Sequence, residues 1–261
     1  MSRGSGAEHN PKEMGFLEHL EELRWVLIRS GIALVVLAVI MFNFSGWLFD
    51  TIIIRPLDSQ FPGMELIFLK PAGNLMAMMN ISLWAAFILG LPYVAWEIWR
   101  FVIPGLFQHE RRLMPILLGV TILCFSAGAA MAYFIIIPYA LHFFLTFGAE
   151  MAVPQIEIKE YISFVLRMIL VFGVIFELPV ISFILARVGL ITPKLLKNIR
   201  AYAIFVIALL SALITPQDPL TMIMAMVPLI ILYEVSILVA WAGKRRHESG
   251  NGDEDPAIAT D

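Results

Sequence analysis

The sequence is poor in charge and in cysteine. Charged side chains make up 15% of its 261 residues, hydrophobic ones 60%, and the mean hydropathy is +0.84. A chain with so little polar surface is not a water-soluble globule, so the composition predicts a polytopic membrane protein. The single cysteine, Cys124, lies inside an apolar run, which excludes an intrachain disulfide and a cysteine metal site.

Sequence signatures of enzymes and of nucleic-acid binding are also missing. No HExxH, GxSxG, P-loop or glycine-rich dinucleotide turn occurs, and the five histidines stand singly, without the spacing of metal ligands. The net charge of −3 is spread between apolar runs, so bulk electrostatics give no reason to expect nucleic acid as a partner. We therefore expect no enzyme, no cofactor and no metal site.

Six apolar runs approach the roughly 20 residues that a membrane-spanning helix needs. They cover about residues 25–49, 74–99, 113–138, 162–186, 201–214 and 220–242. This predicts an all-α fold with one six-helix membrane domain over residues 14–242, between disordered tails at 1–13 and 243–261. The third run continues past Pro138, which we expect to break the helix where it leaves the membrane.

The fifth and sixth spans are predicted to be short. Residues 201–214 rise only about 21 Å as a helix, against a hydrocarbon core of about 30 Å. In the sixth run, Leu220–Tyr233 is uninterrupted until Glu234. Either the bilayer thins or forms a sheltered groove at this hairpin, or Glu234 snorkels to the interface and the helix continues to Trp241.

Basic residues are distributed unevenly between the two sides of the predicted membrane domain. Fourteen of the 18 Lys and Arg residues lie in the tails, at the span ends beside them, and in the connections after spans two and four. Three, Arg55, Lys70 and Lys159, lie on the opposite side, and Arg167 lies within the fourth span. The positive-inside rule then places both termini in the cytoplasm and the chain in the cytoplasmic (inner) membrane.

A carboxylate lies near the middle of the fourth apolar run. Glu177 is followed two residues later by Pro179, and an unused carboxylate at that depth costs several kcal/mol. It either has a function or is a structural group, protonated or hydrogen-bonded, that satisfies a carbonyl freed by Pro179. With Arg167 in the same run, it also leaves open a small-solute or ion secondary transporter, although the two halves show no internal repeat.

Two segments combine apolar and acidic residues next to predicted spans. An amphipathic pattern begins at Phe16 and carries Glu22 on its polar face; this face is either simply solvated or a binding surface. The connection after the second span places Trp99 and Phe101 close to Glu110, although a loop facing water has no reason to expose aromatic side chains. Glu110 either pairs with the arginines beside it or, with this apolar surface, receives a peptide that is part basic and part hydrophobic.

Five motifs in this order resemble the TatC family, the large membrane subunit of the twin-arginine protein translocase. They are FLEHLEELR at 16–24, FQHERR at 107–112, YISF at 161–164, FELP at 176–179 and ITPQD at 214–218. The resemblance covers about residues 14–242. It implies a receptor that binds the twin-arginine signal peptides of folded proteins and organises single-span TatA- and TatB-type subunits for export driven by the proton-motive force. Further copies of the same subunit and membrane lipid are the other implied partners.

The resemblance also implies site residues on the cytoplasmic face. Glu22 and Glu110 match the two carboxylates that bind the twin arginines, and a planar guanidinium pairs with a carboxylate bidentately, as lysine cannot. Phe101 matches a neighbouring position that packs the apolar residue after the arginines, and Arg24 matches one that holds Glu22. A transporter, or a scaffold that only gathers single-span partners, should tolerate the loss of Glu22 and Glu110.

Further matches lie within or beside the last three spans. Glu177 corresponds to a buried acidic residue that faces a concave surface of the family fold. Thr215 and Asp218 lie where the polar residue of a single-span partner is expected to dock. The sequence departs from better-known members in this docking region, with Met222 in place of an amide and Gln217 in place of a second proline.

Overall fold

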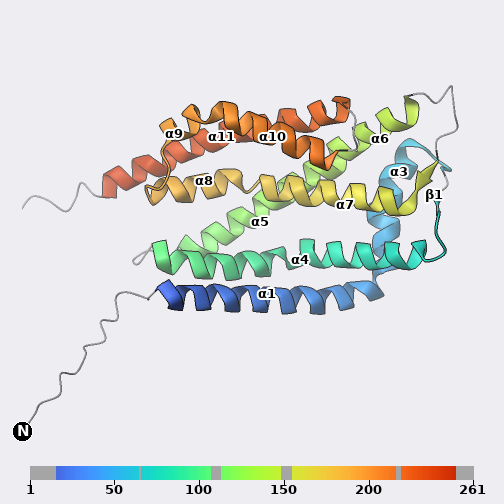
Figure 1. Cartoon of the computed structure of the whole chain (residues 1–261), viewed down its shortest axis with the longest axis horizontal. Helices are drawn as coiled ribbons and strands as arrows, with labels where there is room; N and C mark the ends of the chain where they lie inside the picture. The colour runs from blue at the N-terminus through green and yellow to red at the C-terminus, as the bar shows by residue number, and fades with distance from the viewer. Residues whose placement is uncertain (1–15, 65, 107–112, 148–154, 216–218, 251–261) are drawn as a thin grey trace, which may run out of the picture.

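The protein is described by a computed structural model that covers residues 16–64, 66–106, 113–147, 155–215 and 219–250. Almost all of these residues are helical, and most helices run along the long axis of the molecule (Figure 1). The longer helices are α1 (Phe16–Asn43), α4 (Gly73–Leu106), α5 (Leu113–Met131), α6 (Ile137–Thr146), α7 (Ile158–Ile175), α8 (Leu178–Arg187), α10 (Arg200–Ile214) and α11 (Pro219–Gly250). The prediction of an all-α fold is confirmed.

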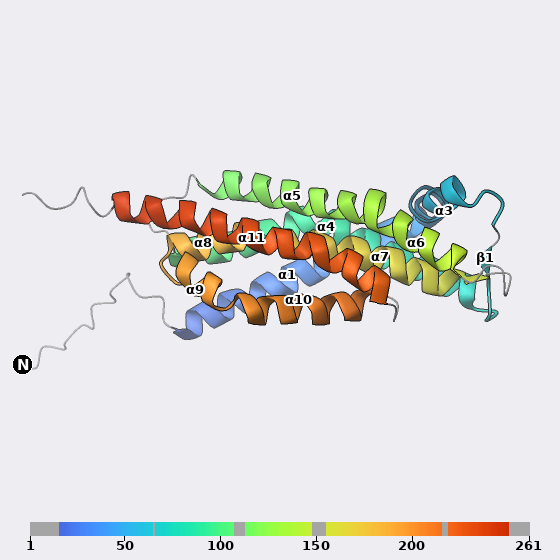
Figure 2. The same cartoon turned by 90° about the horizontal axis from the view of Figure 1, so that it is seen from above.

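Five helical segments among the described residues are long and apolar enough to cross a membrane. They cover Leu20–Asn43, Gly73–Phe101, Pro115–Thr146, Ile158–Arg187 and Pro219–Gly243, and α10 is a shorter sixth apolar helix of 15 residues. Helices α1 and α4 lie side by side at one edge of the bundle, while α5 and α10 lie on opposite faces (Figures 1 and 2). Helix α1 begins and α11 ends at the same end of the bundle.

The third span is bent by Pro138 but not ended by it. Helix α5 passes into a π-helical turn, η2 (Ala132–Ile136), and then into α6, which has Pro138 in its first turn. A wide π turn absorbs the missing N–H and the bulk of a proline ring without breaking the helix. The prediction that Pro138 breaks the span is therefore wrong.

The fourth span bends at Glu177. Helix α7 ends at Ile175 and α8 begins at Leu178, while the backbone N–H of Glu177 donates to the Val174 carbonyl at 3.1 Å. Pro179 lies in the first turn of α8, where a helix has no use for the N–H that proline lacks. The side chain of Glu177 is thus fixed at the bend, at the N-terminus of α8.

The sixth span is long, in contrast to the short helix that its interrupted pattern predicts. Helix α11 continues through Glu234 to Gly250, 32 residues in all. The Glu234 carboxylate accepts a hydrogen bond from Arg200 at the start of α10, so its charge is paired and does not end the helix. Of the two interpretations of this hairpin, the structure supports the continuous helix. Helix α10, with 15 residues, remains short as predicted.

The end of the bundle away from the start of α1 is closed by short elements. Helix α2 (Ser45–Leu48), the π turn η1 (Phe49–Ile54) and α3 (Arg55–Gln60) follow α1 there (Figure 1). The buried Tyr161 hydroxyl donates to the Ile53 carbonyl at 3.0 Å and ties this segment to α7. Strand β1 (Leu66–Ile67) pairs in parallel with β2 (Ile156–Glu157), so the two longest connections at this end are joined.

Two glycines allow α5 and α7 to cross in close contact. A Cβ added to Gly128 would lie 2.5 Å from the Phe172 carbonyl oxygen, and one added to Gly173 would lie 2.4 Å from the Phe125 ring. Small residues of this kind are how helices approach each other inside a membrane. Phe172 is fully buried at this crossing, which anchors the centre of the bundle.

We expect Gly128→Ala to destabilise the protein. The new methyl group meets backbone, which cannot rotate away, and overpacking of this kind costs about 1–3 kcal/mol. Thermal unfolding of the detergent-purified protein, followed by circular dichroism, should therefore show a lower midpoint. Gly119→Ala on the same helix is the matched control, because nothing lies within 4 Å of the added carbon. Equal midpoints for the two variants would contradict the close crossing.

Candidate functional site

A polar pocket of about 250 Å³ lies between the first turns of α1 and the last turns of α4. The side chains that line it follow helical spacing, because residues three and four apart share a face. From α1 these are Glu22, Trp25, Val26 and Arg29, and from α4 they are Glu97, Arg100 and Phe101. The structure thus brings together two of the predicted binding residues, Glu22 and Phe101.

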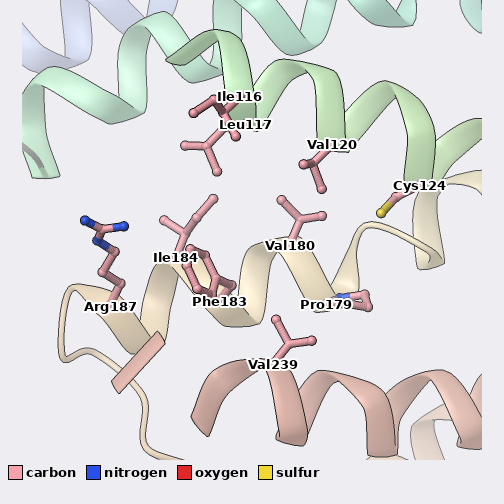
Figure 3. Close-up of a pocket in the computed structure, with 10 residues that line it drawn as sticks. All are labelled: Ile116, Leu117, Val120, Cys124, Pro179, Val180, Phe183, Ile184, Arg187 and Val239. Atoms are coloured by element: carbon pink, nitrogen blue, oxygen red, sulfur yellow. The ribbon is translucent and has the colours of Figure 1, made fainter. Parts of the chain in front are cut away.

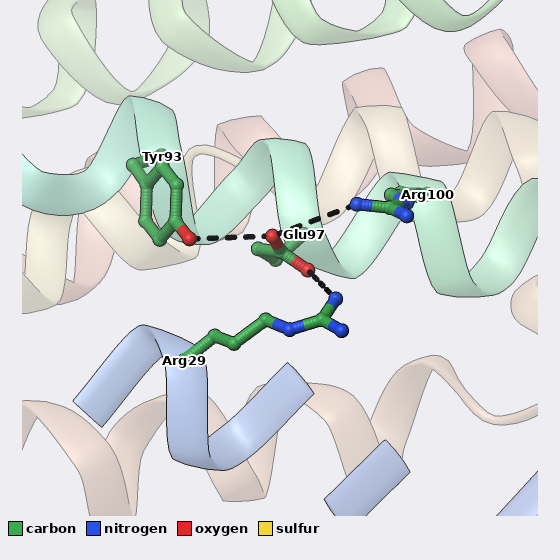
Figure 4. Close-up of polar contacts among 4 residues, drawn as sticks. All are labelled: Arg29, Tyr93, Glu97 and Arg100. Carbon is green, nitrogen blue, oxygen red and sulfur yellow. Dashed lines mark hydrogen bonds and ion pairs between the residues drawn. The ribbon is translucent and has the colours of Figure 1, made fainter. Parts of the chain in front are cut away.

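The carboxylate of Glu97 lies at the centre of this pocket and is surrounded by donors. Its side chain is 5% exposed. Its Oε2 atom lies 3.9 Å from Arg29 Nη1, and its Oε1 atom lies 4.0 Å from Arg100 Nη1 (Figure 4). The Tyr93 hydroxyl donates to Oε1 at 3.3 Å. Among the described residues, Oε2 has no hydrogen-bond partner, because 3.9 Å exceeds hydrogen-bonding distance. A buried carboxylate therefore retains the capacity to accept another donor.

Sequence reasoning missed Glu97. It lies near the end of the second apolar run, between Trp96 and Trp99. A carboxylate within a membrane-spanning segment indicates a function, for Glu97 as much as for Glu177. That signal was available, but the arginine partner from α1 was not, because only tertiary packing places Arg29 beside α4.

The remaining predicted peptide-binding residues lie outside the pocket lining. Arg24 is exposed on α1, and residues two apart on a helix do not share a face, so it points away from the side that Glu22 presents. Glu110 lies outside the described residues. Helix α4 ends at Leu106, four positions before Glu110 and at the same end of the bundle as the pocket (Figure 1).

Glu177 faces α5 from the bend between α7 and α8. Its carboxyl lies toward Thr121 and the backbone of Phe125, while its Oε1 atom is buried without a hydrogen-bond partner among the described residues. Thr121 also accepts a hydrogen bond from Trp99 Nε1 at 3.1 Å. A polar link therefore runs from the end of α4 through α5 to the bend. Arg167, by contrast, is exposed, so it does not form a buried pair with Glu177.

The predicted docking residues lie at the hairpin between α10 and α11. Thr215 is 5% exposed, caps the end of α10, and donates its hydroxyl to the Ser211 carbonyl at 2.8 Å. Asp218 lies outside the described residues. The Ser211 hydroxyl is itself buried and lacks a partner among the described residues. Sequence reasoning missed Ser211, although its spacing of four from Thr215 places both on one face of the helix.

Long apolar helices with a charged pocket at one end of the bundle define a polytopic membrane protein. The sequence matches the family model of the Sec-independent protein translocase protein (TatC) over residues 18–228. The chain therefore belongs to the TatC family and is a component of a protein translocase.

Relatives from several bacteria are similar over most of their length. The TatC protein of Aquifex aeolicus (strain VF5) is 39% identical over 236 residues, which cover 89% of this chain and 97% of the relative. That of Carboxydothermus hydrogenoformans is 38% identical, with 92% and 98% covered, and the TatCy protein of Bacillus subtilis (strain 168) is 36% identical, with 93% and 95% covered.

Two solved structures share the fold. A crystal structure of the twin arginine translocase receptor TatC superposes with a TM-score of 0.81 at 39% identity, covering 87% of this chain and all of that one. A second crystal structure of that receptor, in DDM, has a TM-score of 0.80 at 40% identity and covers 85% and 99%. The fold described above is therefore that of the family.

Proposed function

We propose that this protein is the signal-peptide receptor of a twin-arginine translocase, and that the pocket between α1 and α4 binds the two arginines. The observation that carries this proposal is the sharing of one pocket by Glu22, the buried Glu97 and Phe101. Helix α4 also leads directly into the segment that contains Glu110. The pocket therefore combines carboxylates with an apolar wall, which suits a basic and partly hydrophobic peptide.

The chemistry of the pocket favours arginine over lysine. A guanidinium is a planar fork that binds a carboxylate through two parallel hydrogen bonds, whereas an ammonium is a point charge. Arg29 and Arg100 already place guanidinium groups near Glu97, but at 3.9 Å and 4.0 Å, with side chains 48% and 57% exposed. Such exposed and loosely held groups can move aside, so a peptide arginine replaces them at Glu97. Phe101 and Trp25 then contact the apolar residue that follows.

The orientation of the chain supports the same site. The start of α1, the end of α4 and the end of α11 lie at one end of the bundle (Figure 1). Most Lys and Arg residues belong to the tails, helix ends and connections on that side in the sequence. The positive-inside rule assigns this end to the cytoplasm. Both termini and the pocket then face the compartment in which cargo proteins fold and present their signal peptides.

Partner subunits are proposed to dock at the α10–α11 hairpin. Its buried Ser211 hydroxyl lacks a partner among the described residues, and Thr215 lies one turn away. Both groups are buried in the chain alone, so a polar residue on a single-span TatA- or TatB-type helix would pair with them inside the membrane only when the end of α10 moves to admit it. With Asp218, which precedes α11 in the sequence, this hairpin organises the assembly, together with further copies of the same chain, for export driven by the proton-motive force.

The alternative of a small-solute transporter has little physical support. A transporter requires a polar path through the bundle. Arg167, however, is exposed, and Glu177 faces the Thr121 hydroxyl and the Phe125 backbone of α5. A scaffold without peptide binding stays a distinct alternative, and it predicts that the carboxylates of the pocket between α1 and α4 are dispensable.

We expect Glu97→Gln to weaken binding of an Arg-Arg signal peptide about tenfold, because a hydrogen bond to a charged group contributes about 1.5–3 kcal/mol. The measurement is a titration of a fluorescent peptide against the detergent-purified protein. Glu21→Gln is the matched control, since Glu21 is exposed on α1 and does not line the pocket. If Glu97→Gln and Glu21→Gln both bind the peptide as tightly as the unaltered protein does, Glu97 does not contribute to peptide binding.

A further inference from the structure

A second pocket, of about 400 Å³, lies between α5 and α8 and is almost entirely apolar. Figure 3 shows Val120 of α5 facing Val180 of α8 across this pocket. Val239 of α11, the helix beside α8, also lines it. Arg187 lies at one end and Cys124 at the other (Figure 3). The pocket is therefore an apolar groove with a single cation at its end.

The groove has a firm floor and an open rim. Leu117, Val180 and Ile184 are buried in a small core with Trp99, so the floor is fixed by α4. At the rim, Ile116 is 60% and Val120 39% exposed. Both helices belong to segments long and apolar enough to cross a membrane, so an exposed apolar rim between them suits the hydrocarbon of the bilayer.

The shape and lining of the groove favour a lipid chain over a protein helix. From Pro179 to Arg187 the wall is about 12 Å long at 1.5 Å per residue, and apolar side chains make up nearly all of the lining. An extended acyl chain is much thinner than a helix, which is about 10 Å across, and it needs no polar partner along this length.

The cation at the end of the groove selects the head group. Arg187 lies in the last turn of α8 and is half-buried. A guanidinium has five N–H donors in a fixed fork that matches phosphate, so it serves more than one partner at once. Basic pockets between membrane-spanning helices near the cytoplasmic surface are sites for anionic lipid head groups. We propose that the groove binds one acyl chain of an anionic phospholipid whose phosphate is held by Arg187.

Native mass spectrometry of the full-length protein, stripped of lipid and titrated with phosphatidylglycerol or phosphatidylcholine of equal chain length, tests this site. We expect a preference for phosphatidylglycerol, and Arg187→Gln should weaken its binding about tenfold. Val120→Trp fills the groove and should reduce the binding of both lipids. The matched controls are Lys194→Gln, an exposed cation on α9 (Pro193–Asn198), and Val206→Trp, an exposed valine on α10; both should bind lipid normally.

Folding and alternative occupants are separated by further readouts. Each variant must elute from a size-exclusion column as a single species, which shows that it is folded. If Val120→Trp does not, Ile116→Trp at the rim of the groove is used in its place. Equal binding of the two lipids by the unaltered protein, or normal phosphatidylglycerol binding by Arg187→Gln, would overturn the site. So would a groove-filling variant that binds lipid normally but loses association with single-span partners, because the occupant would then be a helix.

Discussion

Replacing Glu110 with alanine is expected to lower the affinity for a twin-arginine signal peptide at least tenfold, and Glu22→Ala somewhat less. A lost hydrogen-bonded pair with a charged group costs about 1.5–3 kcal/mol, and 1.4 kcal/mol is a factor of ten in affinity. The order follows from the pocket: Glu22 shares it with the buried Glu97, which partly compensates for the loss. Glu110 lies outside the described residues, four positions after the end of α4, and the resemblance to the family assigns it directly to the twin arginines.

The two single variants are measured by the same fluorescent-peptide titration, with Glu21→Ala as the control for a change of charge on α1. Thermal unfolding should remain unchanged in Glu22→Ala and Glu21→Ala, because Glu22 is only partly buried and Glu21 is exposed, and the same measurement on Glu110→Ala shows whether that variant folds. If Glu22→Ala and Glu110→Ala both bind the peptide like the control, these two carboxylates do not recognise it and the scaffold alternative regains support.

Glu177→Leu is expected to lower the rate of protein export about tenfold, whereas Glu177→Gln should export nearly normally. The carboxyl faces Thr121 and the Phe125 backbone on α5, and an amide of equal size can still donate and accept hydrogen bonds there. Leucine cannot, and an unpaired buried polar group costs about 1–3 kcal/mol. This expectation assigns Glu177 a hydrogen-bonding role at the bend that does not require its negative charge.

Export of a folded cargo protein into inverted membrane vesicles is the measurement for Glu177. Val174→Leu is the control, because Val174 is exposed one turn before the bend and should not affect export. Equal loss of export in Glu177→Gln and Glu177→Leu would mean that an ionisable group is needed, and the hydrogen-bonding account of the bend would be wrong.

The sequence allowed the fold class and most of the spans to be predicted, because the length of an apolar run is a local property. It failed where a neighbouring helix changes the meaning of a residue. At Glu234 two interpretations stayed open, and only the pairing with Arg200 from another helix shows why α11 continues. Pro138 marked a break, but a π turn accommodates it within the span.

The candidate site was predictable only in part, for the same reason. Glu22 and Phe101 were chosen on their resemblance to family positions, and the structure places them in one pocket. Glu97 lies within an apolar run and was not predicted, and its place in a charged pocket depends on Arg29 from another helix. No local pattern in the sequence reports such a contact.

The central claim is that carboxylates at this face select arginine over lysine in a signal peptide. The most direct test compares an Arg-Arg with a Lys-Lys signal peptide on the unaltered protein and on a Glu22→Ala/Glu110→Ala double variant. We expect the unaltered protein to bind the Arg-Arg peptide and not the Lys-Lys peptide, and the double variant to lose the difference. Equal binding of both peptides, or binding of neither, by the unaltered protein would contradict the claim.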